Sequence, residues 1–149
     1  MRAGTENISG IVGLAKAVQL AYTDLEEDMT YITGIKEYMK TQLTESCPGI
    51  QFNSHPTQCL YTVLNVSFPP GPQADLMVMS LDIAGVSASG GSACSSGAES
   101  QSHVLEAIGH PFDRKAVRFS FSRNTTKDDI DFAVDQIAGI LAGGAHAVL

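Results

Sequence analysis

The feature that most constrains the fold is a change in hydrophobic period along the chain. Apolar residues recur every three or four positions from Glu6 to about Ser46, which is the period of a helix with one buried face. The segments Leu60–Phe68 and Ala116–Phe121 instead alternate apolar and polar residues, as half-buried strands do. A chain with both patterns is predicted to have an α/β (α+β two-layer) fold, in which helices cover a small sheet.

The helical stretch is predicted to contain two helices, because Thr23-Asp24 provides a break and a cap. Its apolar stripe consists of Ile8, Ile11, Val12, Ala15, Val18, Leu25, Met29, Ile32, Ile35, Met39 and Leu43. Cys47-Pro48-Gly49 ends the second helix. Further helices are predicted at Gln73–Ala84, Ser102–Ile108 and Thr126–Ala142.

The sheet is predicted to be mainly antiparallel and to contain Leu60–Phe68, Val86–Ser87 and Ala116–Phe121, with a short strand at Ile50–Asn53. The helix from Gln73 should face the core with a stripe formed by Leu76, Met77, Met79, Ser80 and Ile83. Thr126 is the expected N-cap of the last helix, because acidic residues follow it in the first turn.

Length and charge place the chain among single-domain proteins of modest size. Its 149 residues fit one domain, residues 1–149, with no linker that would divide it. The formal net charge of −7 argues against a nucleic-acid or anionic-membrane partner, which would need a basic face. No apolar run is long enough for a membrane span. Three cysteines without a CxxC pair favour a reducing, cytoplasmic location.

A run of small and polar residues, Ala88–Gln101, surrounds Cys94. Glycine and serine provide few side chains that could bury this segment, so we predict a loop with an accessible thiol. The run does not match a phosphate-binding GxxxxGK[ST] loop or a GxSxG nucleophile elbow. Cys94 and His103 are too few ligands for a zinc site, so no metal is expected. Cys47 and Cys59 border a helix and a strand and are interpreted as structural or incidental.

The cations in the second part of the chain are confined to one short window. After Lys40 they are Arg114, Lys115, Arg118, Arg123 and Lys127. If Val117 and Phe119 face the core, Arg118 lies on the opposite face of its strand. It could bind a carboxylate there through two parallel hydrogen bonds, or it could be an ordinary surface arginine.

The segment before the first helix, Arg2 to Asn7, includes Thr5. Backbone N–H groups and a threonine hydroxyl at a helix start could bind an anion. Plain N-capping explains the same residues and is the stronger interpretation.

Together these motifs resemble one enzyme family over essentially the whole chain. The matching segments are Arg2-Ala3-Gly4-Thr5-Glu6-Asn7-Ile8, Leu64-Asn65-Val66-Ser67-Phe68, Gly91-Ser92-Ala93-Cys94-Ser95-Ser96, Ser102–Gly109, Val117-Arg118-Phe119-Ser120 and Asn124-Thr125-Thr126. They are similar to the C-terminal part of the NifS/IscS-type cysteine desulfurases. These enzymes use pyridoxal 5′-phosphate, and this region forms their small C-terminal domain.

The resemblance implies a role for three residues. Cys94 matches the loop cysteine that takes sulfur from L-cysteine as a persulfide, and Arg118 matches the arginine that binds the substrate carboxylate. Thr5 matches the threonine that reaches the cofactor phosphate of the neighbouring subunit. The resemblance further implies a homodimer and transfer of the sulfur to an iron–sulfur scaffold or another acceptor protein.

One departure from the family concerns the lysine that binds the cofactor, which follows a histidine. None of the five lysines here follows a histidine, so we expect the chain to be a fragment that lacks the large domain and is inactive alone. Two alternatives stay open. The chain could be a stand-alone persulfide carrier without pyridoxal phosphate, or part of a selenocysteine lyase or aminotransferase with the same fold.

Overall fold

A computed structural model describes residues 4–55, 57–90 and 102–143. The elements are α1 (Ile8–Thr23), α2 (Leu25–Ser46), β1 (Gln51–Phe52), β2 (Val63–Phe68), α3 (Pro72–Asp75), α4 (Met77–Ile83), β3 (Ser89–Gly90), α5 (His103–Ala107), β4 (Lys115–Ser120) and α6 (Lys127–Leu141). This mixture of helices and strands confirms the predicted fold class. The predicted break at Thr23-Asp24 is also confirmed, since α1 ends at Thr23 and α2 begins at Leu25. Asp24 occupies the N-cap position of α2, but its side chain makes no capping hydrogen bond and pairs with Arg123 instead.

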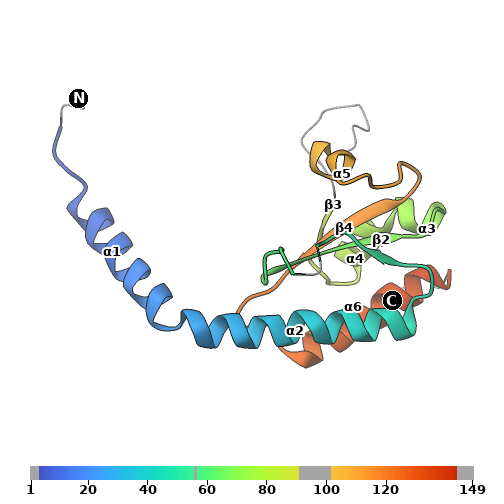
Figure 1. The fold of residues 1–149 in the computed structure, drawn as a ribbon, viewed down its shortest axis with the longest axis horizontal. Helices are drawn as coiled ribbons and strands as arrows, with labels where there is room; N and C mark the ends of the chain where they lie inside the picture. Colours follow the sequence, from blue (N-terminus) through green and yellow to red (C-terminus); the bar gives the residue numbers. More distant parts are fainter. Residues whose placement is uncertain (1–3, 56, 91–101, 144–149) are drawn as a thin grey trace.

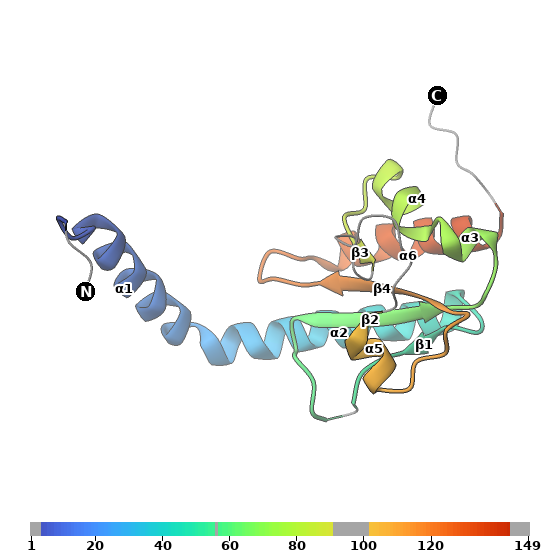
Figure 2. The same cartoon turned by 90° about the horizontal axis from the view of Figure 1, so that it is seen from above.

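The four strands form one antiparallel sheet in the order β1-β2-β4-β3. Its centre is the pair β2 and β4, in which Leu64 lies opposite Phe119 and Asn65 opposite Arg118. Helices α2 and α6 cover one face of the sheet, and α5 lies on the opposite side (Figures 1 and 2). The sheet therefore has one face that packs against α2 and α6 and an opposite face on whose side α5 lies.

The core forms where alternating strand residues meet the helices. Its strand residues are Leu64, Val66, Phe68, Val117, Phe119 and Phe121, all buried. The predicted inward direction of Val117, Phe119 and Phe121 is therefore confirmed. Because side chains alternate along a strand, Asn65, Ser67 and Arg118 belong to the other face.

Polar contacts fix the start of α6 and the start of α2. Thr126 caps α6 as predicted, in a capping box in which its hydroxyl accepts from the Asp129 N–H and the Asp129 carboxylate accepts from the Thr126 N–H. Arg123, just before α6, forms ion pairs with Asp24 at 3.0 Å and Asp28 at 2.7 Å. The start of α2 is thus tied to the loop that enters α6.

Helix α1 extends away from the sheet (Figures 1 and 2). None of its residues is buried, although Ile8, Ile11, Val12, Leu14 and Val18 give it a large apolar surface. The first part of the predicted stripe is therefore helical but uncovered within this chain. None of the helices in the described ranges is long and apolar enough to cross a membrane.

The predicted strand at Val86–Ser87 is wrong, because the helix before it extends its hydrogen bonding to Val86. Gly85 adopts a φ of +83°, and the Val86 N–H donates to the Leu81 carbonyl at 2.8 Å. This is the Schellman arrangement of a helix end. The chain pairs with β4 only from Ser89, where β3 begins.

The predicted stripe on the helix from Gln73 is also wrong in part. Leu76 ends α3 and precedes α4, and this break changes which side chains face inward. Met77 and Leu81 are buried together with Ala74, whereas Leu76, Met79 and Ile83 are exposed. The strand predicted at Leu60–Phe68 is shorter than expected and begins at Val63.

Candidate active site on the polar face of the sheet

A row of three polar residues crosses the face of the sheet that α2 and α6 leave open. Arg118 on β4 lies opposite Asn65 on β2 and opposite Ser89 on β3. Residues in direct register share a face, with Cβ atoms about 5 Å apart. Arg118 is exposed, and its Nη2 atom donates to Ser89 Oγ at 3.4 Å. The guanidinium thus stands at the centre of a polar row.

Arg118 differs from the other cations of its window in what it contacts. Arg123 binds two carboxylates, Lys115 pairs with Asp75 at 3.6 Å, and Lys127 lies over the Tyr38 ring. Arg114 donates to the carbonyls of Gly49 and Ser67. Across the described residues, Arg118 has no carboxylate partner. The N–H groups of its guanidinium are therefore available to donate to an anionic ligand.

A hydrogen-bonded cluster supports this row from the residue after β1 and from the turn after α5. Asn53 Nδ2 donates to Asn65 Oδ1 at 2.7 Å and to Ser67 Oγ at 2.6 Å. Ser67, fully buried, also bonds through Oγ to His110 Nε2. The side chain of Asn65, next to Arg118, is therefore held by Asn53. Asn53 is held in turn by its bond to Ser67, which also bonds to His110.

The turn after α5 brings His110 to Ser67. Gly109 adopts a φ of +72°, and the His110 N–H donates to the Leu105 carbonyl at 2.9 Å, which ends the helix. Burial lowers the pKa of His110, and the nearby Arg114 charge lowers it further, although Asp113 acts in the opposite direction. The neutral imidazole is therefore the favoured form beside Ser67.

The sequence-predicted site residues are not all brought together. Cys94 lies outside the described residues. Thr5 is exposed and precedes α1, whose N-terminal end points away from the sheet (Figure 1). Asn7, in the same segment, caps α1 through Oδ1, which accepts from the Gly10 N–H at 3.0 Å, so the N-capping interpretation is confirmed for Asn7, and a role of Thr5 in anion binding stays a prediction.

The two cysteines interpreted as structural occupy different environments. Cys47 is buried in the core, and burial raises the pKa of its thiol, which fits a structural role. Cys59 is exposed, with its Sγ atom 3.2 Å from Lys36 Nζ. Only Cys47 is therefore part of the core.

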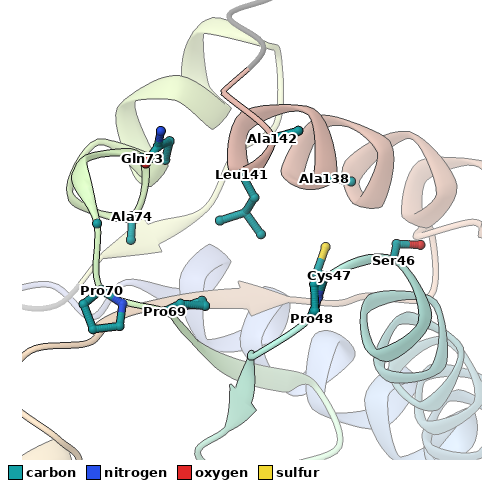
Figure 3. A pocket seen from close by; sticks show the side chains of 11 residues that line it. Ser46, Cys47, Pro48, Pro69, Pro70, Gln73, Ala74, Ala138, Leu141 and Ala142 are labelled. Carbon is teal, nitrogen blue, oxygen red and sulfur yellow. The ribbon is translucent and has the colours of Figure 1, made fainter.

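A cavity of about 340 Å³ lies elsewhere, between the end of α2, the end of β2 and the C-terminal part of α6 (Figure 3). Leu141, Cys47 and Pro69 are among the side chains that line it, and none of the described residues in its lining is charged. Such a lining offers nothing that would bind the carboxylate of an amino acid. The polar row around Arg118 is thus the better candidate site.

The described lysines do not provide a cofactor-binding amine beside Arg118. Lys36 is buried and bonded to the Leu60 carbonyl and Cys59, Lys40 pairs with Glu37, and Lys16 lies on the exposed α1. Lys115 and Lys127 have the contacts given above. A pyridoxal phosphate that needs a lysine therefore does not fit these residues alone. Within the described ranges, no group of three potential metal ligands is found either.

Sequence reasoning missed the supporting cluster of Asn53, Ser67 and His110. Asn65 and Ser67 were part of a segment that resembles the family, and their alternate spacing between Leu64, Val66 and Phe68 places both on the polar face, but neither signal indicated their hydrogen bonds. No local pattern could indicate His110, because it bonds to a residue 43 positions away.

Residues 1–132 match the family model described as Aminotransferase class-V. The chain therefore belongs to the class-V aminotransferase family.

Relatives of this chain within the family include cysteine desulfurases. The cysteine desulfurase IscS of Dictyoglomus turgidum is 32% identical over 142 residues, which cover 94% of this chain and 36% of that protein. Cysteine desulfurase 2 of Trichormus variabilis is 38% identical over 132 residues, covering 87% of this chain and 33% of that protein. The chain thus spans about a third of the length of these relatives.

Solved structures show the same fold. A NifS-like protein from Rickettsia africae superposes with a TM-score of 0.77 at 23% identity, covering 95% of this chain and 36% of that one. A second NifS-like protein superposes with the same TM-score at 26% identity, and the superposition covers 95% of this chain and 35% of that one. The family resemblance seen in the motifs is confirmed.

Proposed function

We propose that this chain is the part of a pyridoxal-phosphate-dependent cysteine desulfurase that binds the substrate carboxylate and receives its sulfur. L-cysteine would give up its sulfur to Cys94 as a persulfide and leave as alanine. The persulfide would then pass to an iron–sulfur scaffold or another acceptor protein. Similarity to cysteine desulfurases over nearly the whole chain supports this assignment.

The observation that carries the proposal is the position and state of Arg118. It is the exposed cation at the centre of the polar row, and it has no carboxylate partner among the described residues. Its neighbour Ser89 belongs to β3, which ends at Gly90. Cys94 follows four residues later, and four residues span at most about 14 Å. Chain connectivity is therefore compatible with an approach of the thiol to a substrate bound at Arg118.

The chemistry assigned to this chain is binding and sulfur acceptance. Arg118 would hold the carboxylate of L-cysteine through two charge-assisted hydrogen bonds, while the Asn65 side chain, fixed by Asn53, flanks it. The Cys94 thiolate would attack the substrate sulfur, so that an S–S bond forms as the substrate C–S bond breaks. Pyridoxal phosphate, when bound, supplies the electron sink for that cleavage.

We further propose that the cofactor lysine belongs to a large domain outside residues 1–149. The chain covers about a third of its relatives, and each of its described lysines contacts another group of the chain. The exposed apolar surface of α1 would pack against that domain. In a homodimer, Thr5 at the far end of α1 would serve the cofactor phosphate of the other subunit. Three cysteines without a CxxC pair support a cytoplasmic location.

The test joins this chain in frame behind the preceding part of the Dictyoglomus turgidum relative and measures alanine and sulfide formed from L-cysteine. The fusion should be active, and Arg118→Lys should raise the KM for L-cysteine roughly ten- to hundredfold, because lysine lacks the planar fork. Arg123→Lys is the matched control, since Arg123 is engaged by Asp24 and Asp28, and its KM should not change.

Three results would contradict the proposal. Unchanged kinetics in Arg118→Lys would make Arg118 a surface residue. Full sulfur transfer in Cys94→Ser would remove the nucleophile assignment. A lysine-bound cofactor absorption band in the isolated chain would show that no further domain is needed.

A further inference from the structure

Asn65, the residue opposite Arg118, has a side-chain amide with one end engaged and the other end open. Its Oδ1 atom accepts from Asn53 Nδ2 at 2.7 Å. No group within residues 4–55, 57–90 and 102–143 accepts from its Nδ2 atom. That atom is not enclosed, because Arg114 Nε is the one buried side-chain nitrogen or oxygen of these residues that lacks a partner. Asn65 therefore keeps its NH₂ group, with two donors, available.

The cluster behind Asn65 imposes this orientation of its amide. Asn53 Nδ2 also donates to Ser67 Oγ at 2.6 Å, and Ser67 Oγ bonds to His110 Nε2. Both bonds of the Asn53 side chain thus use the nitrogen end of its amide. A reversed Asn65 would place its NH₂ group against the NH₂ group of Asn53, and two facing donors lose a hydrogen bond. The network therefore keeps the Asn65 NH₂ group turned away from Asn53.

The order of the strands decides where that NH₂ group is directed. β2, which carries Asn65, lies between β1 and β4. Asn53 directly follows β1, and its N–H donates to the Asn65 carbonyl at 2.9 Å, so Asn53 lies on the β1 side. Arg118 lies opposite Asn65 on the other side, on β4. Because the amide oxygen is held toward β1, the amide nitrogen is directed toward β4 and Arg118.

Donors of two side chains therefore converge on one place on the polar face. The Arg118 guanidinium has no carboxylate partner in the part of the chain that the structure describes, and its bond to Ser89 Oγ is long, at 3.4 Å. A carboxylate offers two oxygens with about four acceptor sites. It can accept two parallel bonds from an arginine and still accept one bond from a neighbouring amide.

We propose that Asn65 is a second ligand of the substrate carboxylate, donating through Nδ2 beside Arg118, and that Asn53 is the positioning residue that orients it. The inference rests on the proposed function, because the carboxylate is that of the amino-acid substrate. It also assigns a specificity. A site that offers donors binds a carboxylate and disfavours the corresponding carboxamide, whose own NH₂ group would face donors.

The experiment uses the fusion enzyme and compares L-cysteine with L-cysteinamide as substrates. Asn65→Asp keeps the bond from Asn53 but replaces the open donor by a negatively charged acceptor. It should raise the KM for L-cysteine roughly hundredfold with kcat changed less than about threefold, and lower the preference for L-cysteine over the amide at least roughly tenfold. Asn53→Ala, which removes the orienting donor, should raise the KM about three- to tenfold. Ser120→Ala, exposed on the same face, is the control and should leave the kinetics unchanged.

A second measurement follows binding without turnover. In the ¹⁵N-labelled chain of 149 residues, sodium acetate should shift the side-chain NH₂ resonances of Asn65 and the Nε–H resonance of Arg118 with a common dissociation constant. Sodium chloride at the same ionic strength should not produce these shifts, because chloride cannot bridge the two side chains as a carboxylate does.

The outcomes separate this inference from the proposed function. A raised KM in Arg118→Lys, together with unchanged KM and substrate preference in Asn65→Asp, would overturn the role of Asn65 alone. Acetate shifts at Arg118 without shifts at Asn65 would do the same, as would an equal loss of activity toward both substrates in Asn65→Asp. Unchanged kinetics in Arg118→Lys would contradict the proposed function as well. If Asn65→Asp does not fold, Asn53→Ala and the acetate titration of the wild type still decide.

Discussion

Replacement of Ser67 by alanine would test whether the cluster behind Arg118 is as important to the fold as its geometry indicates. Ser67 is fully buried, and its Oγ bonds to Asn53 Nδ2 at 2.6 Å and to His110 Nε2. Alanine would leave two largely buried polar groups without this partner, and each such loss costs about 1–3 kcal/mol. Asn53 keeps its bond to Asn65, which reduces its share. We therefore expect Ser67→Ala to lower the free energy of unfolding by about 2–4 kcal/mol.

The assay is urea unfolding followed by far-UV circular dichroism, because the chain contains no tryptophan to serve as a fluorescent probe. An unchanged slope of the unfolding free energy against urea concentration would show that the variant changes stability and not the surface exposed on unfolding. Ser120→Ala is the matched control: Ser120 lies on the same face, two residues after Arg118, and is exposed. Its effect should stay within about 0.5 kcal/mol. A Ser67→Ala variant as stable as the Ser120→Ala variant would refute the reasoning.

Three further predictions concern His110, the cysteines and two glycines. The folded-state pKa of His110 is lowered, so its stabilising contribution should be present above about pH 6.5 and be lost as the pH falls through the lowered pKa. Urea titrations across this pH range should show the loss of stability. His110→Gln should remove this pH dependence. Cys94→Ser should change stability by no more than about 0.5 kcal/mol while abolishing sulfur transfer in the fusion enzyme, whereas Cys47→Ser should keep activity and lose stability; equal stability losses would contradict this. Gly85→Ala should destabilise the protein by roughly 1 kcal/mol because Gly85 has a φ of +83°. Gly34→Ala, inside α2 with open space around its Cα, should instead stabilise it slightly. Thermal melts in which the two variants have the reverse order would refute the left-handed helix end at Gly85.

The amino-acid sequence was sufficient for features that depend on near neighbours. The alternation around Phe119 predicted which side of β4 is buried, and the small polar residues at Thr23-Asp24 predicted the break between α1 and α2. The same alternation predicted that Arg118 faces away from the core. Each of these follows from side-chain period or capping, which are properties of a few consecutive residues.

Other features failed at the sequence level because a local signal had two solutions. The apolar residues from Leu76 to Ile83 suggest one helical face, but a break at Leu76 rotates that face. Val86 has a residue type typical of strands, yet the helix end captures its N–H. The choice between such solutions is made by hydrogen bonds and packing that the pattern does not specify.

By itself, then, the sequence determined the order and type of most elements, the apolar face of the sheet and the outward direction of Arg118. Only the tertiary structure decided what surrounds that arginine, because Asn65 and Ser89 come from separate parts of the chain and lie beside Arg118 through the pairing of β2, β3 and β4. It also decided that α1 remains uncovered and that Lys36 contacts Cys59. Periodicity is set between residues a few positions apart, whereas a site is set by contacts between residues that are distant along the chain.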